Sequence, residues 1–201
     1  MYFEKEGIYH LYNQGNNRGK IFYSERNFEY FIEKIKKYII PYADILSWCL
    51  MPNHFHLMLY IHRVTQPIHR VTASHPVNNR TLNDSIAIML RSYTRAVNEE
   101  QNRTGSLFRE ETKAKCLEGI EGISPSWFTV NGITQINIQD PELQHPQVCF
   151  NYVHLNPVKH NLVKNISDWK YSSFHEYCGN EEFSLVNKNK VKELELFFKL
   201  A

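Results

Sequence analysis

The chain has 201 residues, of which 42% are hydrophobic and 22% charged, and its formal net charge is +2. These values are typical of a globular domain and exclude a disordered chain; so small a charge gives no reason by itself to expect nucleic-acid binding. The four cysteines lie far apart without CxxC spacing, which excludes a zinc knuckle and a disulfide framework. The N-terminus has no apolar leader segment and no stretch approaches membrane-spanning length, so we expect a reduced, cytoplasmic protein.

The apolar pattern predicts an alternation of strands and helices over the first 117 residues. A strand over residues 8–13 and a helix capped by Ser24 precede a hairpin whose strands cover residues 43–50 and 54–61. A second helix over residues 81–101 and a strand over residues 112–117 follow. This β-α-β-β-α-β order is that of the ferredoxin-like split arrangement, so we expect an α+β fold built on an antiparallel sheet.

The rest of the chain gives weaker signals. The stretch 61–65 recurs at 68–72, most simply as a tandem duplication in a surface loop, and residues 118–144 contain only two short β-like runs, at 127–130 and 133–138. A short helix is expected to open at Pro146 and to end near Asn156, because the residue before a proline avoids the helical region.

Two units are expected along the chain. Residues 1–160 form a domain that includes this short helix, and residues 161–201 form a C-terminal tail packed on it. In the tail, residues 168–177 are rich in aromatic rings, and a terminal helix over 191–200 would turn Leu194, Phe197 and Phe198 inward.

The histidines His54 and His56 stand at the start of the most apolar strand, directly after a Pro-Asn turn. Side chains alternate along a strand, so the two imidazoles point to one face and Phe55 points to the other. Rings about 7 Å apart on one face can converge on a metal ion or on a ligand held by one. Such a pair can also simply tolerate a half-buried strand, so the motif is weak when taken alone.

Two stretches together carry a family resemblance. Residues 51–57 (MPNHFHL) and 152–159 (YVHLNPVK) resemble the two signatures of the REP-associated single-tyrosine transposases, members of the HUH nuclease superfamily. Residues 12–18, 105–108 and 169–173 support the resemblance, which extends from about Ile8 to Tyr177. Either main stretch alone would be unspecific, but the two together are highly specific.

The resemblance implies a metal-dependent single-stranded DNA endonuclease and transposase, which cleaves and rejoins DNA near hairpin repeats through a 5′-phosphotyrosine. It implies Tyr152 as the nucleophile on a catalytic helix, and His54, His56 and Asn156 as ligands of Mg²⁺ or Mn²⁺. His154, between Tyr152 and Asn156 but on another face, is expected to be structural or to touch DNA.

The expected partner is single-stranded DNA with a hairpin, and the protein is expected to be a monomer in free solution. Its expected DNA footprint is formed by basic side chains from several elements: Arg18, Arg91, Arg95, Lys113, Lys115 and Lys159. Compared with the family it resembles, the chain is expected to be longer over residues 62–79 and 118–144, at places where we expect a DNA hairpin to be held.

The runner-up function is a module on the same fold that binds single-stranded nucleic acid without cutting it, since such sheets stack bases on aromatic rings. The combination of His54, His56, Tyr152 and Asn156 argues against this alternative, because a pure binding module has no need of it. A small-molecule metalloenzyme is weakened by the lack of a third histidine or carboxylate at ligand spacing.

Overall fold

The computed structural model describes residues 1–64, 80–117 and 146–198, and the backbone of residues 126–130 and 133–137. Its main sheet has four strands in the order β2-β3-β1-β4, with every neighbouring pair antiparallel. The elements follow the chain in the predicted β-α-β-β-α-β order, which confirms the α+β fold: β1 (Ile8–Gln14), α1 (Glu25–Tyr38), β2 (Ala43–Met51), β3 (His54–Ile61), α2 (Leu82–Glu100) and β4 (Lys113–Cys116). The five-residue repeat lies largely outside the described residues.

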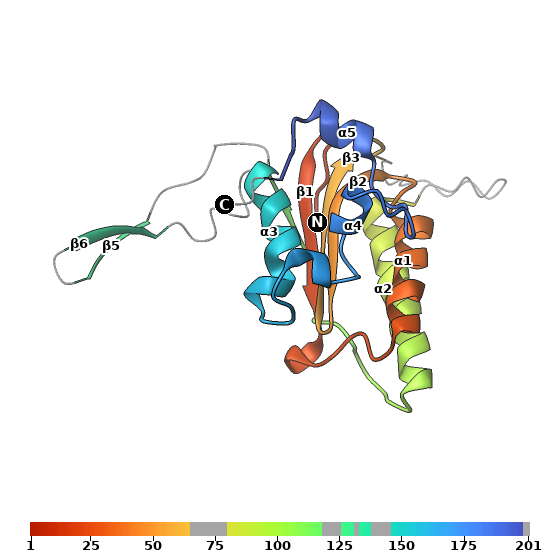
Figure 1. The fold of residues 1–201 in the computed structure, drawn as a ribbon. Helices are drawn as coiled ribbons and strands as arrows, with labels where there is room; N and C mark the ends of the chain where they lie inside the picture. The colour runs from red at the N-terminus through yellow and green to blue at the C-terminus, as the bar shows by residue number, and fades with distance from the viewer. Residues whose placement is uncertain (65–79, 118–125, 131–132, 138–145, 199–201) are drawn as a thin grey trace.

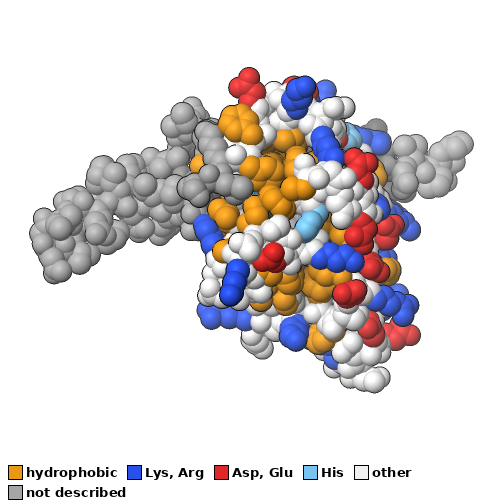
Figure 2. All heavy atoms as spheres, viewed as in Figure 1, with side chains coloured by type: hydrophobic (Ala, Val, Ile, Leu, Met, Phe, Trp, Pro, Cys, Tyr) orange, Lys and Arg blue, Asp and Glu red, His pale blue; other side chains and the backbone are white. Residues whose placement is uncertain are grey.

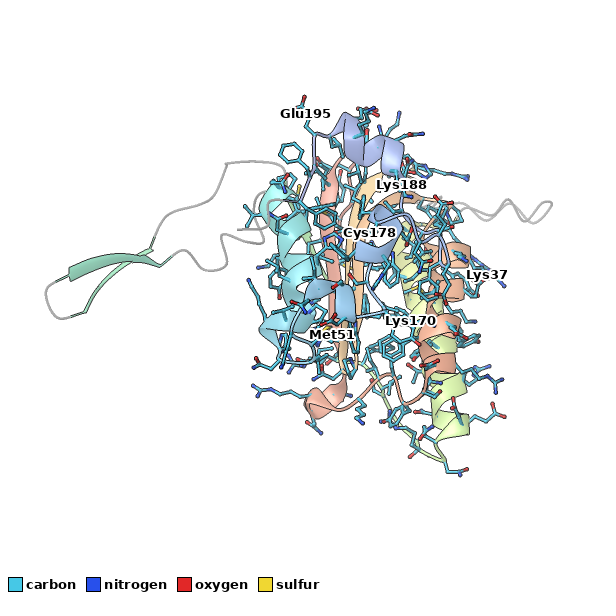
Figure 3. All side chains as sticks on the ribbon, in the orientation of Figure 1. Lys37, Met51, Lys170, Cys178, Lys188 and Glu195 are labelled. Atoms are coloured by element: carbon cyan, nitrogen blue, oxygen red, sulfur yellow. The ribbon has the colours of Figure 1, made fainter. Side chains whose placement is uncertain are left out.

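Three layers result, with the sheet in the middle (Figure 1). Helices α1 and α2 cover one face, and α3 (Pro146–Lys159) lies on the other face against β2 and β3. On the face seen in Figure 2, hydrophobic side chains run through the middle of the molecule, while charged side chains crowd along its α1 side. Lys37 on α1, for example, projects away from the sheet (Figure 3). The strands β5 (Ser126–Val130) and β6 (Ile133–Asn137) pair antiparallel in a separate sheet.

Strand β3 divides its side chains between two cores. Phe55, Leu57 and Leu59 are fully buried in the core shared with α1 and α2, where the ring centre of Phe55 lies 5.1 Å from that of Phe31. Met58 belongs to the second core, which includes residues of α3. His54 and His56 have the same strand parity as Met58, so they turn toward α3 as the alternation predicts.

The two long helices begin where the sequence places them, but only the second has a side-chain cap at its N-terminus. Thr81 and Asp84 form a reciprocal capping box at the start of α2. Ser24 occupies the cap position of α1, yet its side chain makes no capping bond. The prediction of a Ser24 cap is therefore wrong in its chemistry, and the side chain of Asn27 instead accepts a hydrogen bond from the Tyr23 backbone (2.9 Å).

Helix α3 continues past the point where the sequence predicted its end. It includes Pro157 and runs to Lys159. Asn156 and Pro157 are both buried, so the packing of this turn outweighs the local preference against a helical residue before proline. The correction matters because the extra turn carries His160 to the same face as Asn156.

The C-terminal residues pack on β2 and α3. A 3-10 turn, η3 (Ile166–Asp168), leads to a short helix, α4 (Phe174–Tyr177), and then to α5 (Lys188–Glu193). The prediction of a terminal helix over 191–200 is thus wrong in extent: α5 ends at Glu193, and Phe197 is 53% exposed, whereas Leu194 and Phe198 pack partly buried against the second core. None of the described helices combines the length and apolarity that crossing a membrane requires.

A buried carboxylate fastens these residues to the sheet. The Glu176 carboxylate accepts a hydrogen bond from the indole of Trp48 on β2 (2.7 Å). Its other oxygen accepts from the backbone amides of Leu185 and Val186, each at 2.9 Å. Since Glu176 is only 2% exposed, these three donors have no access to water as a substitute partner.

We predict that Glu176→Ala lowers the free energy of unfolding by about 3 kcal/mol, because it leaves buried donors without an acceptor. Urea denaturation of the purified protein measures this loss. The control is Glu182→Ala, which removes an exposed carboxylate paired with Lys170 (3.1 Å) and should leave the stability within measurement error. Equal stabilities of the two variants would contradict the anchoring role of Glu176.

Candidate functional site

The side chains of His54, His56 and Asn156 meet between β3 and α3. Nε2 of His54 lies 3.0 Å from Oδ1 of Asn156, and Nε2 of His56 lies 3.2 Å from its Nδ2. All three residues are buried, with Asn156 completely so. Residues 102 and 100 positions apart thus place two imidazole nitrogens around one amide group.

A chain of hydrogen bonds determines which nitrogen of His54 carries the proton. The Asn53 amide donates to the carbonyl oxygen of Arg18 (3.2 Å), which leaves its oxygen facing Nδ1 of His54 (2.6 Å). An amide oxygen only accepts, so Nδ1 is protonated, and Nε2 of a neutral ring presents a lone pair to Oδ1 of Asn156. These two acceptors, 3.0 Å apart, are satisfied only by a cation or by a second proton on the ring.

His56 is oriented by His10, a residue to which neither motif pointed. Nε2 of His56 accepts from the Asn156 amide, so its Nδ1 carries the proton and donates to Nε2 of His10 at 2.8 Å. The two rings are stacked, with their centres 5.0 Å apart. His10 and Tyr12 are two residues apart on β1, as His54 and His56 are on β3, so each pair shares one face of its strand. This spacing was the signal in the sequence that could have identified His10 and Tyr12.

Burial keeps these imidazoles uncharged. It lowers the pKa of His56 well below the usual range, and neighbouring histidines act in the same direction. It also lowers the pKa of His54, although the Asn156 oxygen, which would accept a hydrogen bond from the charged ring, opposes the shift. The pKa of His10 falls to about 3 because of burial and the nearby Lys115 charge. A second proton on His54 is therefore disfavoured, whereas neutral imidazole is the form that binds metal ions.

The donor set fits a divalent cation. Lone pairs of His54 and His56 and the amide group of Asn156 converge on one place, and an added positive charge relieves the facing acceptors there. Such a mixed nitrogen and oxygen set leaves coordination positions open for phosphate and water, which suits Mn²⁺ or Mg²⁺. Within the described residues, no group of three or more histidine, cysteine or acidic side chains could hold a metal ion. The amide is therefore needed to complete the set.

Tyr152 lies one helical turn before Asn156, half-buried beside the histidines. Its ring stands nearly perpendicular to that of His56, with centres 5.4 Å apart, and lies 6.0 Å from that of His10. Nζ of Lys159 is 5.0 Å from the centre of the tyrosine ring. The sheet and α3 thus bring the predicted nucleophile and the predicted ligands together.

A cavity of about 250 Å³ opens beside these groups and is lined by His54, His56 and Tyr152. From the sequence, His160 is a candidate phosphate contact in the loop after the helix, whereas Arg109 is no candidate; both line the cavity. The rings of His160 and His54 lie 5.1 Å apart at their centres. The spacing of four residues places His160 on the face of Asn156, which was not predicted because the helix was expected to stop at the proline.

The basic residues predicted to contact DNA fall into separate groups. Lys113 lines the cavity, Lys159 lies over Tyr152, and Lys115 adds its charge beside His10. Arg91 and Arg95 line a larger groove on the α2 side of the sheet. Arg18 belongs to the 3-10 turn η1 (Asn16–Arg18), where its carbonyl oxygen holds Asn53.

His154 faces away from the cavity and has a structural role, the first of the two alternatives expected for it. Nδ1 donates to the Phe150 carbonyl oxygen (2.7 Å), and Nε2 accepts from the Ser173 hydroxyl (2.7 Å). Ser173 in turn receives a hydrogen bond from the Trp48 backbone (2.9 Å). The helix that carries Tyr152 and Asn156 is thereby tied to the sheet through a buried histidine.

Comparison with known proteins finds relatives that share one name. A protein of Haemophilus influenzae named as a REP-associated tyrosine transposase is 26% identical over 135 residues, which make up 66% of this chain and 59% of the relative. The chain is similar to the REP-associated tyrosine transposases. It spans less than two thirds of the length of that relative, and no family model matches it.

Two further matches to REP-associated tyrosine transposases differ in what they cover. The REP-associated tyrosine transposase of Escherichia coli is 56% identical over 25 residues, or 12% of this chain and 15% of the relative. A solved structure of a REP-associated tyrosine transposase bound to a REP hairpin superposes with a TM-score of 0.52 at 18% identity. It covers 88% of this chain and 81% of the solved chain, and it establishes the shared fold.

We predict that His154 makes stability depend on mild acid. Burial lowers its pKa from 6.5 to about 4, so between these pH values the unfolded chain takes up a proton that the folded chain does not. The stability that neutral His154 contributes to the folded protein is complete above pH 6.5 and is lost as the pH falls toward 4.

The replacement His154→Gln should therefore flatten the curve of unfolding free energy against pH. Its slope between pH 6 and 4 should fall by up to roughly 1.4 kcal/mol per pH unit. Urea denaturation over a pH series, with chelator present, measures both proteins. Parallel curves would contradict a neutral buried His154.

Proposed function

We propose that the protein is a metal-dependent single-stranded DNA endonuclease and transposase, which cleaves and rejoins DNA near hairpin repeats through a 5′-phosphotyrosine. One observation carries the proposal: α3 places Tyr152 and Asn156 on one face, and that face meets His54 and His56 at a cavity. The similarity to proteins named as REP-associated tyrosine transposases, one of them solved with a REP hairpin, supports this substrate class.

In this reaction, Tyr152 is the residue that forms and breaks covalent bonds with the DNA. Its hydroxyl oxygen attacks phosphorus, the bond from phosphorus to the 3′ oxygen breaks, the phenolic proton passes to solvent, and the 3′ oxygen leaves as a hydroxyl. Attack of a 3′-hydroxyl on the phosphotyrosine reverses these bonds and rejoins the strand. A divalent ion, when bound, would neutralise and polarise the phosphate.

The remaining residues orient and support these groups. A phenol with an ordinary pKa of about 10 is a weak nucleophile at neutral pH, so positioning and nearby positive charge matter. The Lys159 ammonium, 5.0 Å from the ring centre of Tyr152, would stabilise negative charge on the phenol. His154 fixes the helix from its opposite face through Ser173, so attack and metal coordination depend on one rigid element.

We predict that Tyr152→Phe keeps the fold, Mn²⁺ affinity and single-strand binding but forms no covalent DNA adduct, because only the attacking oxygen is lost. Denaturing electrophoresis after incubation with Mn²⁺ and labelled, hairpin-flanked single strands detects the adduct. The control is Tyr177→Phe, a tyrosine on the far side of α3 whose hydroxyl donates to the Leu46 carbonyl. It should still form the adduct.

A DNA-linked band that persists in Tyr152→Phe would move the nucleophile elsewhere. If the wild type binds every hairpin substrate tightly and yet forms no band, the protein is a non-cutting binding module.

We predict that Asn53→Ala weakens Mn²⁺ binding by about 10- to 100-fold, because His54 loses the acceptor that fixes its protonated nitrogen. Asn53→Asp keeps an acceptor and should retain most of the affinity. Isothermal titration calorimetry compares these variants with the double variant His54→Ala, His56→Ala, which should bind no Mn²⁺.

The control for general histidine loss is His62→Ala, an exposed histidine directly after the far end of β3. Unchanged Mn²⁺ affinity in the double variant would refute the metal site. Equal losses in Asn53→Ala and Asn53→Asp would refute the orienting role of Asn53.

A further inference from the structure

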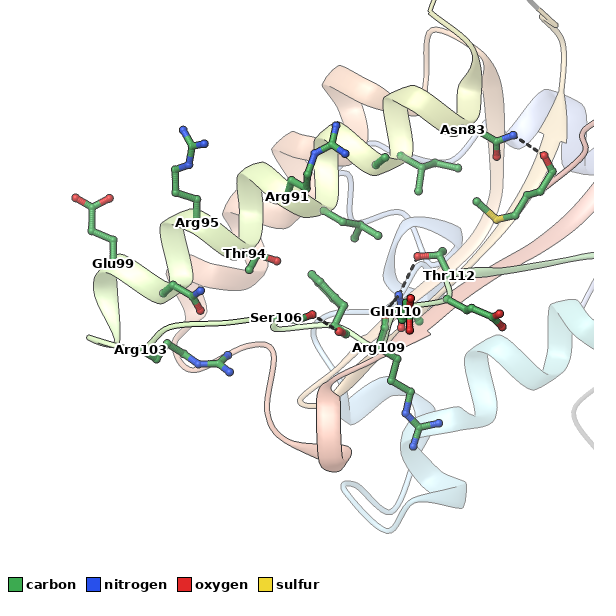
Figure 4. A pocket seen from close by; sticks show the side chains of 18 residues that line it. Asn83, Arg91, Thr94, Arg95, Glu99, Arg103, Ser106, Arg109, Glu110 and Thr112 are labelled. Carbon is green, nitrogen blue, oxygen red and sulfur yellow. Dashed lines mark hydrogen bonds between the residues drawn. The ribbon is translucent and has the colours of Figure 1, made fainter.

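A groove of about 1150 Å³ lies between α2 and residues 103–112 (Figure 4). Pockets that bind drug-sized ligands measure roughly 300–1,000 Å³, so this groove has room for a larger ligand. It lies on the α2 side of the sheet, whereas the cavity beside Tyr152 lies on the α3 side. Neither of the two motifs includes a residue of the groove.

The groove and the cavity adjoin each other at one edge of the sheet. Asn13, Arg109 and Glu111 line both spaces. The edge strand β4 begins only at Lys113, and the Asn13 amide holds the segment before it through Arg109 (3.2 Å) and Thr112 (2.8 Å). A chain molecule with its reacting phosphate in the cavity can therefore continue into the groove.

The charges of the groove suit an anionic ligand. Arg91 and Arg95 project from successive turns of α2, and Arg103 and Arg109 come from the facing segment (Figure 4). None of the ion pairs among the described residues involves these arginines. The carboxylates that line the groove lie toward its ends: Glu99 at the last turn of α2, and Glu110 and Glu111 near the cavity.

Unsatisfied polar atoms point to a ligand with both donors and acceptors. Within the described residues, the buried atoms Oδ1 of Asn83, Oδ1 of Asn98 and Nη1 of Arg103 have no hydrogen-bond partner, and all three residues line the groove. The amide of Asn98 is fixed because its nitrogen donates to the Gly105 carbonyl oxygen (2.8 Å). Buried polar atoms are rarely left unpaired, and these offer acceptors for base N–H groups and a donor for phosphate.

We propose that this groove binds the single-stranded DNA next to the scissile phosphate, with the arginines on phosphates and the two asparagines on base edges. Unpaired bases expose the edges that such amides can bind, which favours a single strand over a duplex. The proposal rests on the proposed function, because it takes the cavity as the place of cleavage. It assigns the groove the role of holding the strand that enters or leaves that cavity.

The test uses the full chain with Arg91→Ala and Arg95→Ala combined, both exposed residues whose loss should leave the fold intact. Binding of a fluorescent single strand with a flank of several nucleotides is followed by anisotropy over a range of salt. The affinity should fall at least about fivefold, and the slope of log affinity against log salt should decrease by about 1.4, or about 0.7 for each lost phosphate contact. The control combines Lys34→Ala and Lys37→Ala on α1, which remove the same charge outside the groove and should leave the slope unchanged.

Adduct formation by the wild type is measured beside binding, so the two proposals fail separately. If the wild type forms the Tyr152 adduct but the arginine variant binds with wild-type affinity and slope, the groove assignment is overturned and the function stands. If no adduct forms but the arginine variant loses affinity and slope, the groove binds single strands and the cleavage proposal fails. Equal effects of the arginine and lysine pairs would show that only net charge matters, which also overturns the groove.

Discussion

The alternation of side chains along β3 is the constraint on which the site depends. One face of the strand supplies Phe55, Leu57 and Leu59 to the core under α1 and α2, and this packing fixes the register and orientation of the strand. The opposite face must then turn His54 and His56 toward α3. A shift of one residue would exchange the two sets and bury the histidines among aromatic rings. The same packing that stabilises the sheet therefore aims the histidines at the helix.

Helix α3 completes the arrangement because both of its faces are used. Tyr152, Asn156 and His160 follow one another at intervals of one turn on the face toward β3, while His154 on the other face is held through Ser173. Ser173 lies directly before α4, whose Glu176 is bonded to Trp48 of β2. The described C-terminal residues thus hold the helix in place, and none of them lines the cavity. The position of the helix relative to the strand therefore depends on the packing of the whole fold.

Electrostatics gives this arrangement its chemical character. Burial keeps the imidazoles of His10, His54 and His56 neutral. The hydrogen bonds of His54 and His56 leave a lone pair of each ring facing the amide of Asn156. Positive charge is supplied by lysines and arginines at the borders of the cavity and along the adjoining groove. A site of neutral donors surrounded by cations suits a phosphate chain and the metal ion that would accompany it. This distribution also explains how a net charge of only +2 is compatible with an anionic partner.

The sequence by itself determined the order of strands and helices, the common face of His54 and His56, and the spacing of Tyr152 and Asn156. These follow from local periodicity, which residues close in the chain decide. It could not place Asn156 between the two histidines, because these contacts join residues 102 and 100 positions apart. It missed the position of His160 beside His54, since the local preference before Pro157 was outweighed by the burial of that turn, and it missed the roles of His10 and Asn53. Only the tertiary structure decided these features, because hydrogen-bond partners and burial depend on which elements pack together.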